Sequence, residues 1–459
     1  MYKIDFSKPV HVHFIGIGGI SMSGFAELLH TLGFTISGSD KAESRITEHL
    51  EDSGIHIIYG QSASNITPDI DLIVYTAAIS EDNPEYAQAL ASGIPMMDRA
   101  EMVGQVMKNY KSAIAIAGTH GKTTTTSMVS HIYLAAGMDP TISVGGILKA
   151  IEGNLRIGHS GNFITEACEY TNSFLKFNPT SAIILNIEAD HLDFFKDLDD
   201  IRNSFRQFAR NLPEQGLLII NGEIDNVEGI TADLTCRTFS YGLSGNYDYS
   251  AANITFDDMG RGAFDLVEQG AALGHISLSV VGMHNISNAL AAAALALNLG
   301  ISMEAVAGGL ASFTGTDRRF ELKGTVGGVT VIDDYAHHPT EIKATLSSAL
   351  KYPHKDLWCV FQPHTYTRTR ALLDDFAEAL CGADKIVLTD IYAAREKNTG
   401  DISSLDLRDK LENMGKEVYY FPSFDEIENF LLEHCTNGDM LITMGAGDVV
   451  LIGESLLGQ

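Results

Sequence analysis

The sequence is poor in cationic residues and in cysteine, and both shortages limit what the protein can do. Its 459 residues include 31 Lys and Arg against 59 Asp and Glu, a formal net charge of −28. So acidic a chain argues against broad binding to nucleic acid or to anionic membranes. A phosphate-bearing ligand must therefore be held by local N–H groups, metal ions and a few well-placed cations. The five cysteines are scattered and form no C-x-x-C pair, which favours reduced thiols and a cytoplasmic protein.

Long apolar runs are also missing. The longest, ALAAAALALNLG at 289–300, is too short to span a bilayer, so we expect a buried helix there and no membrane insertion. The first residues contain no apolar core and no cleavage site, and we expect no signal peptide. A chain of this length is too long for one hydrophobic core, which predicts several domains.

Short apolar strands alternate with helical segments in three successive stretches of the chain. The first stretch runs from residue 10 to about 107, the second starts with SAIAIAG at 112–118, and the third starts near Asp317. This rhythm is typical of α/β folds with parallel sheets. We predict three consecutive domains: a Rossmann-like domain at 1–107, a central P-loop domain with added β-strands at 108–315, and a Rossmann-like C-terminal domain at 316–459.

A glycine-rich turn, GIGGIS at 16–21, follows the first apolar run and opens a helical segment. This arrangement is typical of a dinucleotide-binding turn, and Asp40 lies 24 residues after Gly16, where a ribose-binding acid would lie. However, Ser21 occupies the third glycine position. NAD binding, a tight turn without a ligand, and another diphosphate on the same helix N-terminus therefore all remain open. Arg99 could assist an anion at this turn.

A second glycine turn, AGTHGKTTTT at 117–126, resembles a phosphate-binding loop more specifically. Ile116 stands where a strict Walker A motif has glycine, but the shorter spacing keeps the essential groups. Backbone N–H groups can surround a phosphate, Lys122 can reach the β and γ oxygens, and Thr123 can meet Mg²⁺. The sequence therefore predicts an ATP site here.

Two polar clusters follow neighbouring predicted strands of the central domain. EACEYTNSFL at 166–175 holds two glutamates, and NIEADHLDFF at 186–195 holds further acids and His191. Carboxylates and a histidine at strand ends beside a phosphate loop fit the ligands of a hard metal ion. Zinc is not expected, because Cys168 stands alone.

Polar pairs later in the chain add candidate ligand contacts. Asn285 and Asn288 lie one turn apart at the start of an alanine-rich helix, where one could cap the helix and the other could bind adenine. Adjacent Arg318 and Arg319 favour a phosphate or a carboxylate partner in so acidic a chain.

Two further motifs occupy equivalent places in the third domain. VIDDYAHHPTE at 331–341 and FQPHTYTRTR at 361–370 both lie at the carboxyl ends of predicted strands. Because ligands bind at that edge of open parallel sheets, we expect the two motifs to share one site.

Taken in order, these motifs closely resemble the Mur ligase family of peptidoglycan synthesis over nearly the whole chain. The resemblance implies an ATP-dependent ligase that joins L-alanine to the lactyl carboxylate of UDP-N-acetylmuramate through an acyl-phosphate, giving ADP and phosphate. It also implies a cytoplasmic monomer or homodimer. The alternatives are a sister ligase that attaches another amino acid or a peptide, a non-catalytic nucleotide-binding regulator and, more remotely, a nicotinamide oxidoreductase.

The resemblance further implies a role for each motif residue. The UDP-sugar would be bound by Gly16, Gly18, Gly19, Ser21, Ser39, Asp40, Thr76 in the TAAI loop, and Arg99. ATP would be bound by Gly118, Thr119, His120, Gly121, Lys122, Thr123, Thr124, Asn285, Asn288, Arg319 and Asp333. The acceptor and amino acid would face Tyr335, His338, Arg368 and Arg370. Catalysis would rest on Lys122, Glu169, His191, His338 and Arg370.

The resemblance implies two Mg²⁺ ions, for which Mn²⁺ can substitute. Thr123 and Glu169 would bind one ion and His191 the second. The family commonly has E-A-D-E where this chain has E-A-C-E, with Cys168 in place of the aspartate. Several sister ligases use a carbamylated lysine at the second metal, but RNSFRQFAR at 202–210 contains no lysine, so none is expected here.

Overall fold

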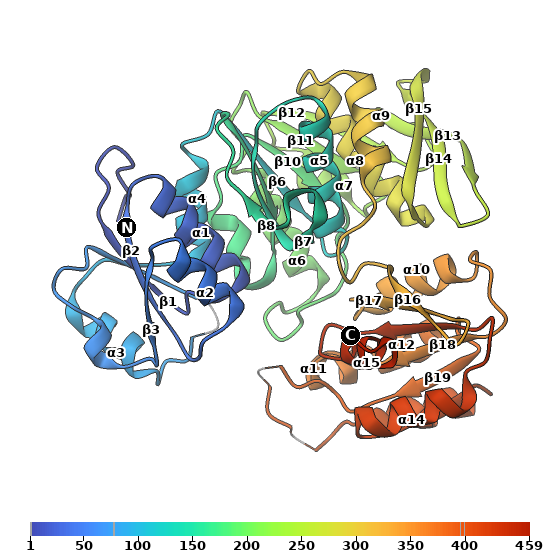
Figure 1. Cartoon of the computed structure of the whole chain (residues 1–459). Helices are drawn as coiled ribbons and strands as arrows, with labels where there is room; N and C mark the ends of the chain where they lie inside the picture. The colour runs from blue at the N-terminus through green and yellow to red at the C-terminus, as the bar shows by residue number, and fades with distance from the viewer. Residues whose placement is uncertain (1, 77–78, 395, 399) are drawn as a thin grey trace.

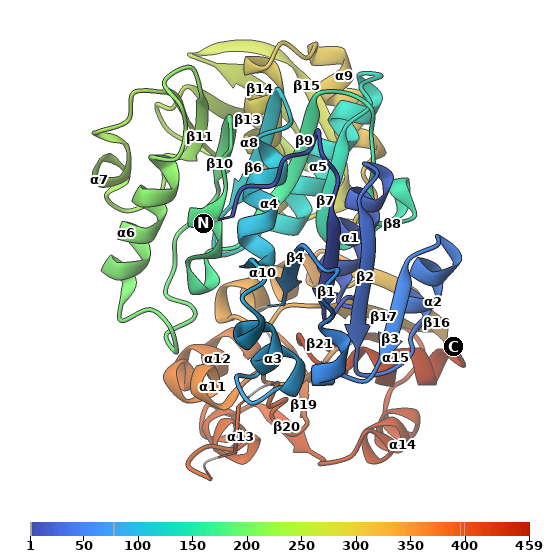
Figure 2. The same ribbon diagram turned by 90° about the vertical axis from the view of Figure 1, so that its left-hand side faces the viewer.

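The computed structural model describes residues 2–76, 79–394, 396–398 and 400–459, and within them the chain forms three sheets covered by helices (Figure 1). The N-terminal part and the C-terminal part both adjoin the central part. In the turned view of Figure 2, the third part forms the lower end of the molecule. The expected architecture of three α/β parts is confirmed.

The first sheet has the strand order β3-β2-β1-β4-β5, and all its described pairs are parallel. Its strands are β1 (His11–Ile15), β2 (Thr35–Asp40), β3 (His56–Tyr59), β4 (Leu72–Tyr75) and β5 (Met96–Asp98). The helices are α1 (Ile20–Thr31), α2 (Arg45–Asp52), η1 (Ala63–Asn65), α3 (Pro84–Ser92) and α4 (Arg99–Met107). The strand order reverses between β1 and β4, and the turn at 16–21 leaves β1 there, which is the usual ligand position in such sheets.

The central sheet has the order β15-β14-β13-β12-β11-β10-β6-β9-β7-β8 among the described residues. Its parallel part consists of β6 (Ser112–Ala117), β7 (Thr141–Leu148), β9 (Asn162–Ala167), β10 (Ser181–Ile184), β11 (Leu217–Asn221), β12 (Arg237–Gly242) and β13 (Tyr249–Phe256). Antiparallel strands extend both ends: β8 (Gly153–Arg156), β14 (Arg261–Glu268) and β15 (Ala271–Val281).

The helices of the central part are α5 (Lys122–Ala135), η2 (Lys149–Ile151), η3 (Tyr170–Lys176), α6 (Leu198–Ala209), α7 (Val227–Thr231), α8 (Met283–Asn298) and α9 (Met303–Ser312). Helix α8 holds most of the alanine-rich run, and its residues from Ala289 to Ala296 are fully buried. Small side chains let α8 pack closely on its neighbours, so the expected buried helix is confirmed. Among the described helices, none has the length and apolar character that a membrane span requires.

The third sheet has the order β16-β17-β21-β18-β19-β20, with only the β16–β17 pair antiparallel among those described. Its strands are β16 (Glu321–Val326), β17 (Val329–Asp334), β18 (Leu357–Phe361), β19 (Lys385–Leu388), β20 (Glu417–Tyr420) and β21 (Met440–Met444). Its helices are α10 (Pro339–Ala349), α11 (Tyr366–Ala371), α12 (Leu373–Leu380), α13 (Ser404–Asn413), α14 (Phe424–His434) and α15 (Val450–Leu457). The domain boundaries at 107/108 and 315/316 stay predictions.

The first part packs on the central part through a glycine of α4. A Cβ atom on Gly104 would meet the carbonyl oxygen of Lys176 at 1.9 Å, so only glycine permits this approach of α4 to the end of η3. The side-chain amide of Asn178 donates to the carbonyl of Gly104 at 2.8 Å, and Lys176 pairs with Asp98. These contacts bring the turn at 16–21 toward the carboxyl ends of the central strands.

Candidate active site

The phosphate loop lies between β6 and α5 and takes its shape from two glycines and one asparagine. Gly118 has φ +150° and Gly121 has φ +82°, backbone conformations that other residues rarely adopt. The side-chain oxygen of Asn186 accepts from the N–H of His120 at 2.7 Å, and its carbonyl accepts from the N–H of Thr119 at 3.1 Å. The loop is therefore tied to the end of β10, where the second polar cluster begins.

Lys122 lies at the first position of α5 and contacts a carboxylate from the neighbouring strand end. Its ammonium group is 2.9 Å from Oε2 of Glu169 and donates to the carbonyls of Gly118 and Thr119 at 2.5 and 3.1 Å. Burial lowers the pKa of Lys122, but the charge of Glu169 outweighs burial and holds the pKa above its ordinary value. The side chain is thus a fixed cation within the loop.

Glu169 has the properties of a metal ligand. It is 2% exposed, and its Oε1 atom is buried without a hydrogen-bond partner among the described residues. That atom lies 3.8 Å from Nε2 of His191. Burial lowers the pKa of His191, which keeps the imidazole neutral and able to bind a metal. An orphaned carboxylate oxygen facing a neutral imidazole fits a divalent cation.

The contacts of Thr123, Glu166 and Cys168 show which other donor atoms the candidate metal site offers. The hydroxyl of Thr123 donates to Oε2 of Glu166 at 3.1 Å, and Oε1 of Glu166 accepts from the N–H of Gly145 at 2.5 Å. Burial raises the pKa of the Cys168 thiol to about 11, so this side chain stays protonated at neutral pH and offers no thiolate. The donor set is therefore hydroxyl, carboxylate and imidazole, which suits Mg²⁺ or Mn²⁺.

A cavity of about 170 Å³ adjoins the phosphate loop and receives side chains from the central and third parts. Its lining includes the predicted ATP residues His120, Gly121, Thr124, Asn285, Asn288 and Arg319. Asn285 donates to the carbonyl of Val281 at 2.8 Å, and Asn288 donates to the side-chain oxygen of Asn285 at 3.2 Å. The two amides therefore form a short chain along the wall of this cavity.

The end of β17 carries two adjacent aspartates, of which Asp334 lines the cavity, and the assignment of Asp333 to ATP stays a prediction. Asp333 is fully buried and pairs with Arg318 at 3.0 Å and with the hydroxyl of Thr443 at 2.7 Å, away from the cavity lining. The next residue, Asp334, lines the cavity, and burial raises its pKa to about 6 against the opposing charge of Arg319. Successive strand residues point to opposite faces, so the alternation along β17 could have separated the two.

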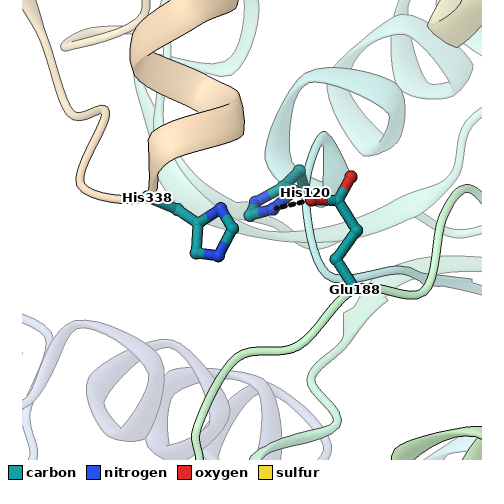
Figure 3. Close-up of side chains that lie close together, drawn as sticks. All are labelled: His120, Glu188 and His338. Atoms are coloured by element: carbon teal, nitrogen blue, oxygen red, sulfur yellow. Dashed lines mark ion pairs between the residues drawn. The ribbon is translucent and has the colours of Figure 1, made fainter. Parts of the chain in front are cut away.

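His120 connects the phosphate loop to the third part of the chain (Figure 3). Its Nδ1 atom lies 3.1 Å from Oε1 of Glu341 in α10, and its Nε2 atom lies 3.5 Å from Oε2 of Glu188. Burial lowers the pKa of His120, but the two carboxylates outweigh burial and raise it to about 9, which makes the ring a cation at neutral pH. The sequence did not assign Glu341 a role, although it closes the motif that contains His338.

His338 lies beside His120. Its ring centroid is 4.6 Å from that of His120, and its Nε2 atom is 3.3 Å from the carbonyl of Ala189. Tyr335 lies elsewhere, beneath the guanidinium groups of Arg318 and Arg319 at 4.8 and 5.3 Å.

A second cavity, of about 190 Å³, joins the metal candidate to the arginines of α11. Its lining includes Asp190, His191, Arg368 and Arg370. Two nitrogens of Arg368 donate to one oxygen of Asp190 at 3.0 and 2.9 Å, and both side chains are more than nine-tenths buried. Burial opposes ionisation of Asp190, but Arg368 outweighs it and holds the pKa of Asp190 well below its ordinary value. Arg370 is half exposed and pairs with Asp401.

The end of β2 holds the glycine turn at 16–21 in place through hydrogen bonds. The carbonyl of Ser39 accepts from the N–H groups of Gly16 and Ile17 at 2.9 and 3.0 Å, and Asp40 accepts from the N–H of Gly18 at 2.8 Å. Gly19 precedes α1 as its N-cap. Ser21 and Arg99 are joined at 3.1 Å through the guanidinium group. Thr76 lies against Gly16, where an added Cβ atom would approach its methyl group to 2.8 Å.

The structure thus brings the eight predicted UDP-sugar residues to one end of the first sheet. Ala77 and Ala78 of the TAAI loop lie outside the described residues. The half-buried guanidinium of Arg99 is near enough to Glu166 for the carboxylate charge to act on it. The turn at 16–21 therefore faces the metal candidates of the central part.

A buried polar network that the sequence analysis missed lies beneath this turn. The hydroxyl of Ser39 donates to Oε2 of Glu85 at 2.6 Å, and Oε1 of Glu85 lies 2.9 Å from Nε2 of His13. The other ring nitrogen of His13 lies 2.8 Å from the hydroxyl of Ser37. All four side chains are buried. The sequence Asn83-Pro84-Glu85 predicts only the capped start of a helix. Nothing in the sequence therefore indicated that Glu85 takes part in this network.

Known families and proteins match this chain along most of its length. Residues 11–111 match the description "Mur ligase family, catalytic domain", residues 116–296 match "Mur ligase middle domain", and residues 318–447 match "Mur ligase, glutamate ligase domain". The chain is 61% identical to the UDP-N-acetylmuramate–L-alanine ligase of Lachnoclostridium phytofermentans and 63% identical to that of Agathobacter rectalis, with 100% of both chains covered each time.

Two solved structures of ligases also match nearly the whole chain. The chain is similar to the UDP-N-acetylmuramate–alanine ligase of Thermotoga maritima, with a TM-score of 0.81, 29% identity and 98% of each chain covered. It is also similar to a murein peptide ligase of Psychrobacter arcticus, with a TM-score of 0.72, 27% identity and 98% of each chain covered.

Proposed function

The chain belongs to the Mur ligase family, and from this premise we propose that it joins L-alanine to the lactyl carboxylate of UDP-N-acetylmuramate while ATP is converted to ADP and phosphate. The observation that carries the choice of reaction is the identity above 60%, over the full length, to two ligases that bear this name. The geometry supports the same reaction, because the glycine turn at 16–21 faces, through Arg99, the carboxylate of Glu166 beside the phosphate loop. A ligase needs both glycine turns if its acid substrate carries one nucleotide and a second nucleotide activates that acid.

The central part would bind ATP. The cavity beside the phosphate loop would take the nucleoside, with Asn285 and Asn288 offering amide groups to a purine edge. Lys122, now paired with Glu169, would exchange part of that contact for the β and γ oxygens. Glu169 and His191 would hold Mg²⁺ with Thr123 nearby, and Mg²⁺ when bound supplies charge neutralisation for phosphoryl transfer.

The first part would bind the UDP-sugar at the N-terminus of α1. The N–H groups of Gly16 and Gly18 already donate to Ser39 and Asp40, so these contacts set the shape of the turn. The free end of α1, with Ser21 and Arg99, would then accept the diphosphate. This position directs the lactyl carboxylate toward the central strand ends.

The reaction would proceed in two steps. The lactyl carboxylate attacks the γ-phosphate of ATP, which forms an acyl-phosphate and releases ADP. The amine of L-alanine then attacks the acyl carbon, and the tetrahedral intermediate releases phosphate. Arg368 and Arg370 line the second cavity and, with His338, would lie on the amino-acid side, where the fixed positive charge of the two arginines favours a carboxylate. The buried contact of Arg368 with Asp190 would keep water from the acyl-phosphate while the third domain is closed.

A phosphate-release assay tests the proposal. Purified protein is incubated with UDP-N-acetylmuramate, ATP and Mg²⁺, together with L-alanine, glycine, L-serine or a peptide, and each component is omitted in turn. Release that requires all three substrates and is fastest with L-alanine supports the proposal. Release that favours the peptide would instead identify a peptide ligase like the similar protein of P. arcticus. The Lys122→Ala variant serves as the control for contaminating phosphatase.

A further inference from the structure

We propose that His120, Glu188 and His338 form a binding site for one borderline divalent metal ion, of the Zn²⁺ or Co²⁺ class, between the central and third domains. The three side chains come from the phosphate loop, from the segment after β10 and from the residue before α10. One ligand atom of each lies within 4.8 Å of those of the other two. Figure 3 shows the three side chains converging from separate segments.

The spacing of the ligand atoms is close to that of a bound ion. Nε2 of His120 and Oε2 of Glu188 are 3.5 Å apart. Two ligands about 2.0–2.2 Å from a tetrahedral zinc ion are separated by about 3.4 Å. The Nε2 atom of His120 is buried and makes no hydrogen bond with the described residues. This nitrogen is therefore placed to bind a metal ion beside Glu188, where the ion would displace the ring proton.

Each ligand also has a partner that orients it. Nδ1 of His120 contacts Glu341 at 3.1 Å, Nε2 of His338 contacts the carbonyl of Ala189 at 3.3 Å, and Oε2 of Glu188 accepts from the hydroxyl of Thr340 at 2.5 Å. Metal-binding histidines usually donate their second ring N–H to a carboxylate or a carbonyl. Nδ1 of His338 accepts one long hydrogen bond of 3.4 Å from the N–H of Thr340, which an ion at this nitrogen would replace.

The local charge favours a cation. Glu188 and Glu341 lie on either side of His120, at 3.5 and 3.1 Å from its ring nitrogens. The combined charge of the two carboxylates matches one divalent ion. Two imidazole nitrogens with one carboxylate suit Zn²⁺, Co²⁺ or Ni²⁺ better than Mg²⁺, which prefers oxygen ligands. The site is therefore chemically distinct from the proposed Mg²⁺ site at Glu169.

An ion at this site would join two domains. His120 and Glu188 belong to the central part, whereas His338 precedes α10 of the third part. His120 and Glu188 also line the cavity proposed for ATP, so the fourth metal position would open into that cavity. A bound ion would hold the third domain against the phosphate loop.

Metal titration of the full-length protein, without substrates, tests this proposal. Metal-free protein is titrated with Co²⁺ and followed by its visible absorption, and with Zn²⁺ by calorimetry in excess Mg²⁺. We expect one ion per chain with the intense absorption of tetrahedral Co²⁺. Glu188→Gln and His338→Gln should each abolish that absorption, and Glu341→Gln should weaken binding about 10- to 100-fold. Glu304→Gln, on the exposed first turn of α9, is the matched control and should bind like the wild type.

One further variant separates this site from the Mg²⁺ site. His191→Ala removes a proposed Mg²⁺ ligand and should keep the Co²⁺ absorption. Loss of the absorption in His191→Ala but not in Glu188→Gln or His338→Gln would overturn the proposal, as would a wild type that binds no Co²⁺. Because no turnover is measured, either failure leaves the proposed ligase reaction untouched.

Discussion

Lys122 and Glu169 form a buried ion pair of 2.9 Å that joins the start of α5 to the end of β9. The group assigned to phosphate and the group assigned to the metal ion are therefore direct neighbours. Their side chains are 15% and 2% exposed, so each charge depends on the other for its compensation. Substitution of either residue leaves the other charge buried without its partner.

Replacement of Lys122 should stop the reaction without affecting the first domain. We expect Lys122→Ala to lower kcat about 100- to 1,000-fold or more, because a fixed cation at the transferring phosphoryl group is lost. The dissociation constant for UDP-N-acetylmuramate should stay within about twofold of the wild type, since α1 and its turn belong to another sheet. Phosphate release and calorimetry measure the two quantities. Lys108→Ala, at the exposed end of α4, is the matched control. Near-normal ligation by Lys122→Ala would reject the assignment.

The contact between Arg368 and Asp190 should control how the third domain sits on the central domain. Arg368→Ala leaves Asp190 as a buried carboxylate without its main partner, at a cost of about 3–5 kcal/mol to the closed arrangement. We expect a larger radius of gyration in solution scattering with an ATP analogue and UDP-sugar, together with loss of activity.

Arg408→Ala is the control for this experiment, because Arg408 pairs with Asp409 on the exposed surface of α13. Its scattering curve should match that of the wild type. An Arg368→Ala variant with an unchanged curve would show that other contacts hold the domains together.

Local signals predicted much of this protein. The positions of the two glycine turns, the acid clusters and the alanine-rich helix follow from residue type and spacing, and the structure has strand-to-helix turns at residues 16–21 and 118–121. What spacing cannot supply is pairing across long separations. His120 and Glu341 are 221 positions apart, and only the packing of α10 on the phosphate loop brings them together. The two adjacent aspartates of β17 show a smaller limit of sequence-based prediction. The motif VIDDYAHHPTE contains both Asp333 and Asp334, and the direction of each side chain from the strand decides that Asp334 lines the cavity.

Glu85 should affect UDP-sugar binding through Ser39. Glu85→Gln replaces an acceptor of two hydrogen bonds by an amide that can accept only at its oxygen, so the bond to His13 or to Ser39 is lost. We expect a cost of about 1–3 kcal/mol to the stability of the first domain. The KM for UDP-N-acetylmuramate should rise, while the KM for ATP stays unchanged.

The control for Glu85 is Glu81→Gln, an exposed glutamate four residues earlier. A Glu85→Gln variant whose apparent kcat falls while both KM values stay unchanged would point to a general loss of folded protein instead of an effect through Ser39. Glu85→Asp, which keeps the charge, should recover part of the UDP-sugar affinity.

His131 should contribute to the acid sensitivity of the central domain. His131 belongs to α5, and its ring lies against the end of α9, where Nδ1 is 2.8 Å from the hydroxyl of Ser312. Burial lowers the pKa of this imidazole. The unfolded chain takes up a proton at this residue near pH 6.5, whereas the folded chain does so only at lower pH. The resulting stability is present above about pH 6.5 and is lost as pH falls through 6.5 toward the folded-state pKa.

His131→Gln removes this titration and keeps a polar group near Ser312. We therefore expect the urea midpoint of the variant to fall less between pH about 7 and 5 than that of the wild type, as followed by circular dichroism. His159→Gln, at a histidine side chain that is 85% exposed, is the matched control. Equal slopes for wild type and His131→Gln would mean that the folded protein accepts the proton on His131 as readily as the unfolded chain does, which the burial of the ring between α5 and α9 argues against.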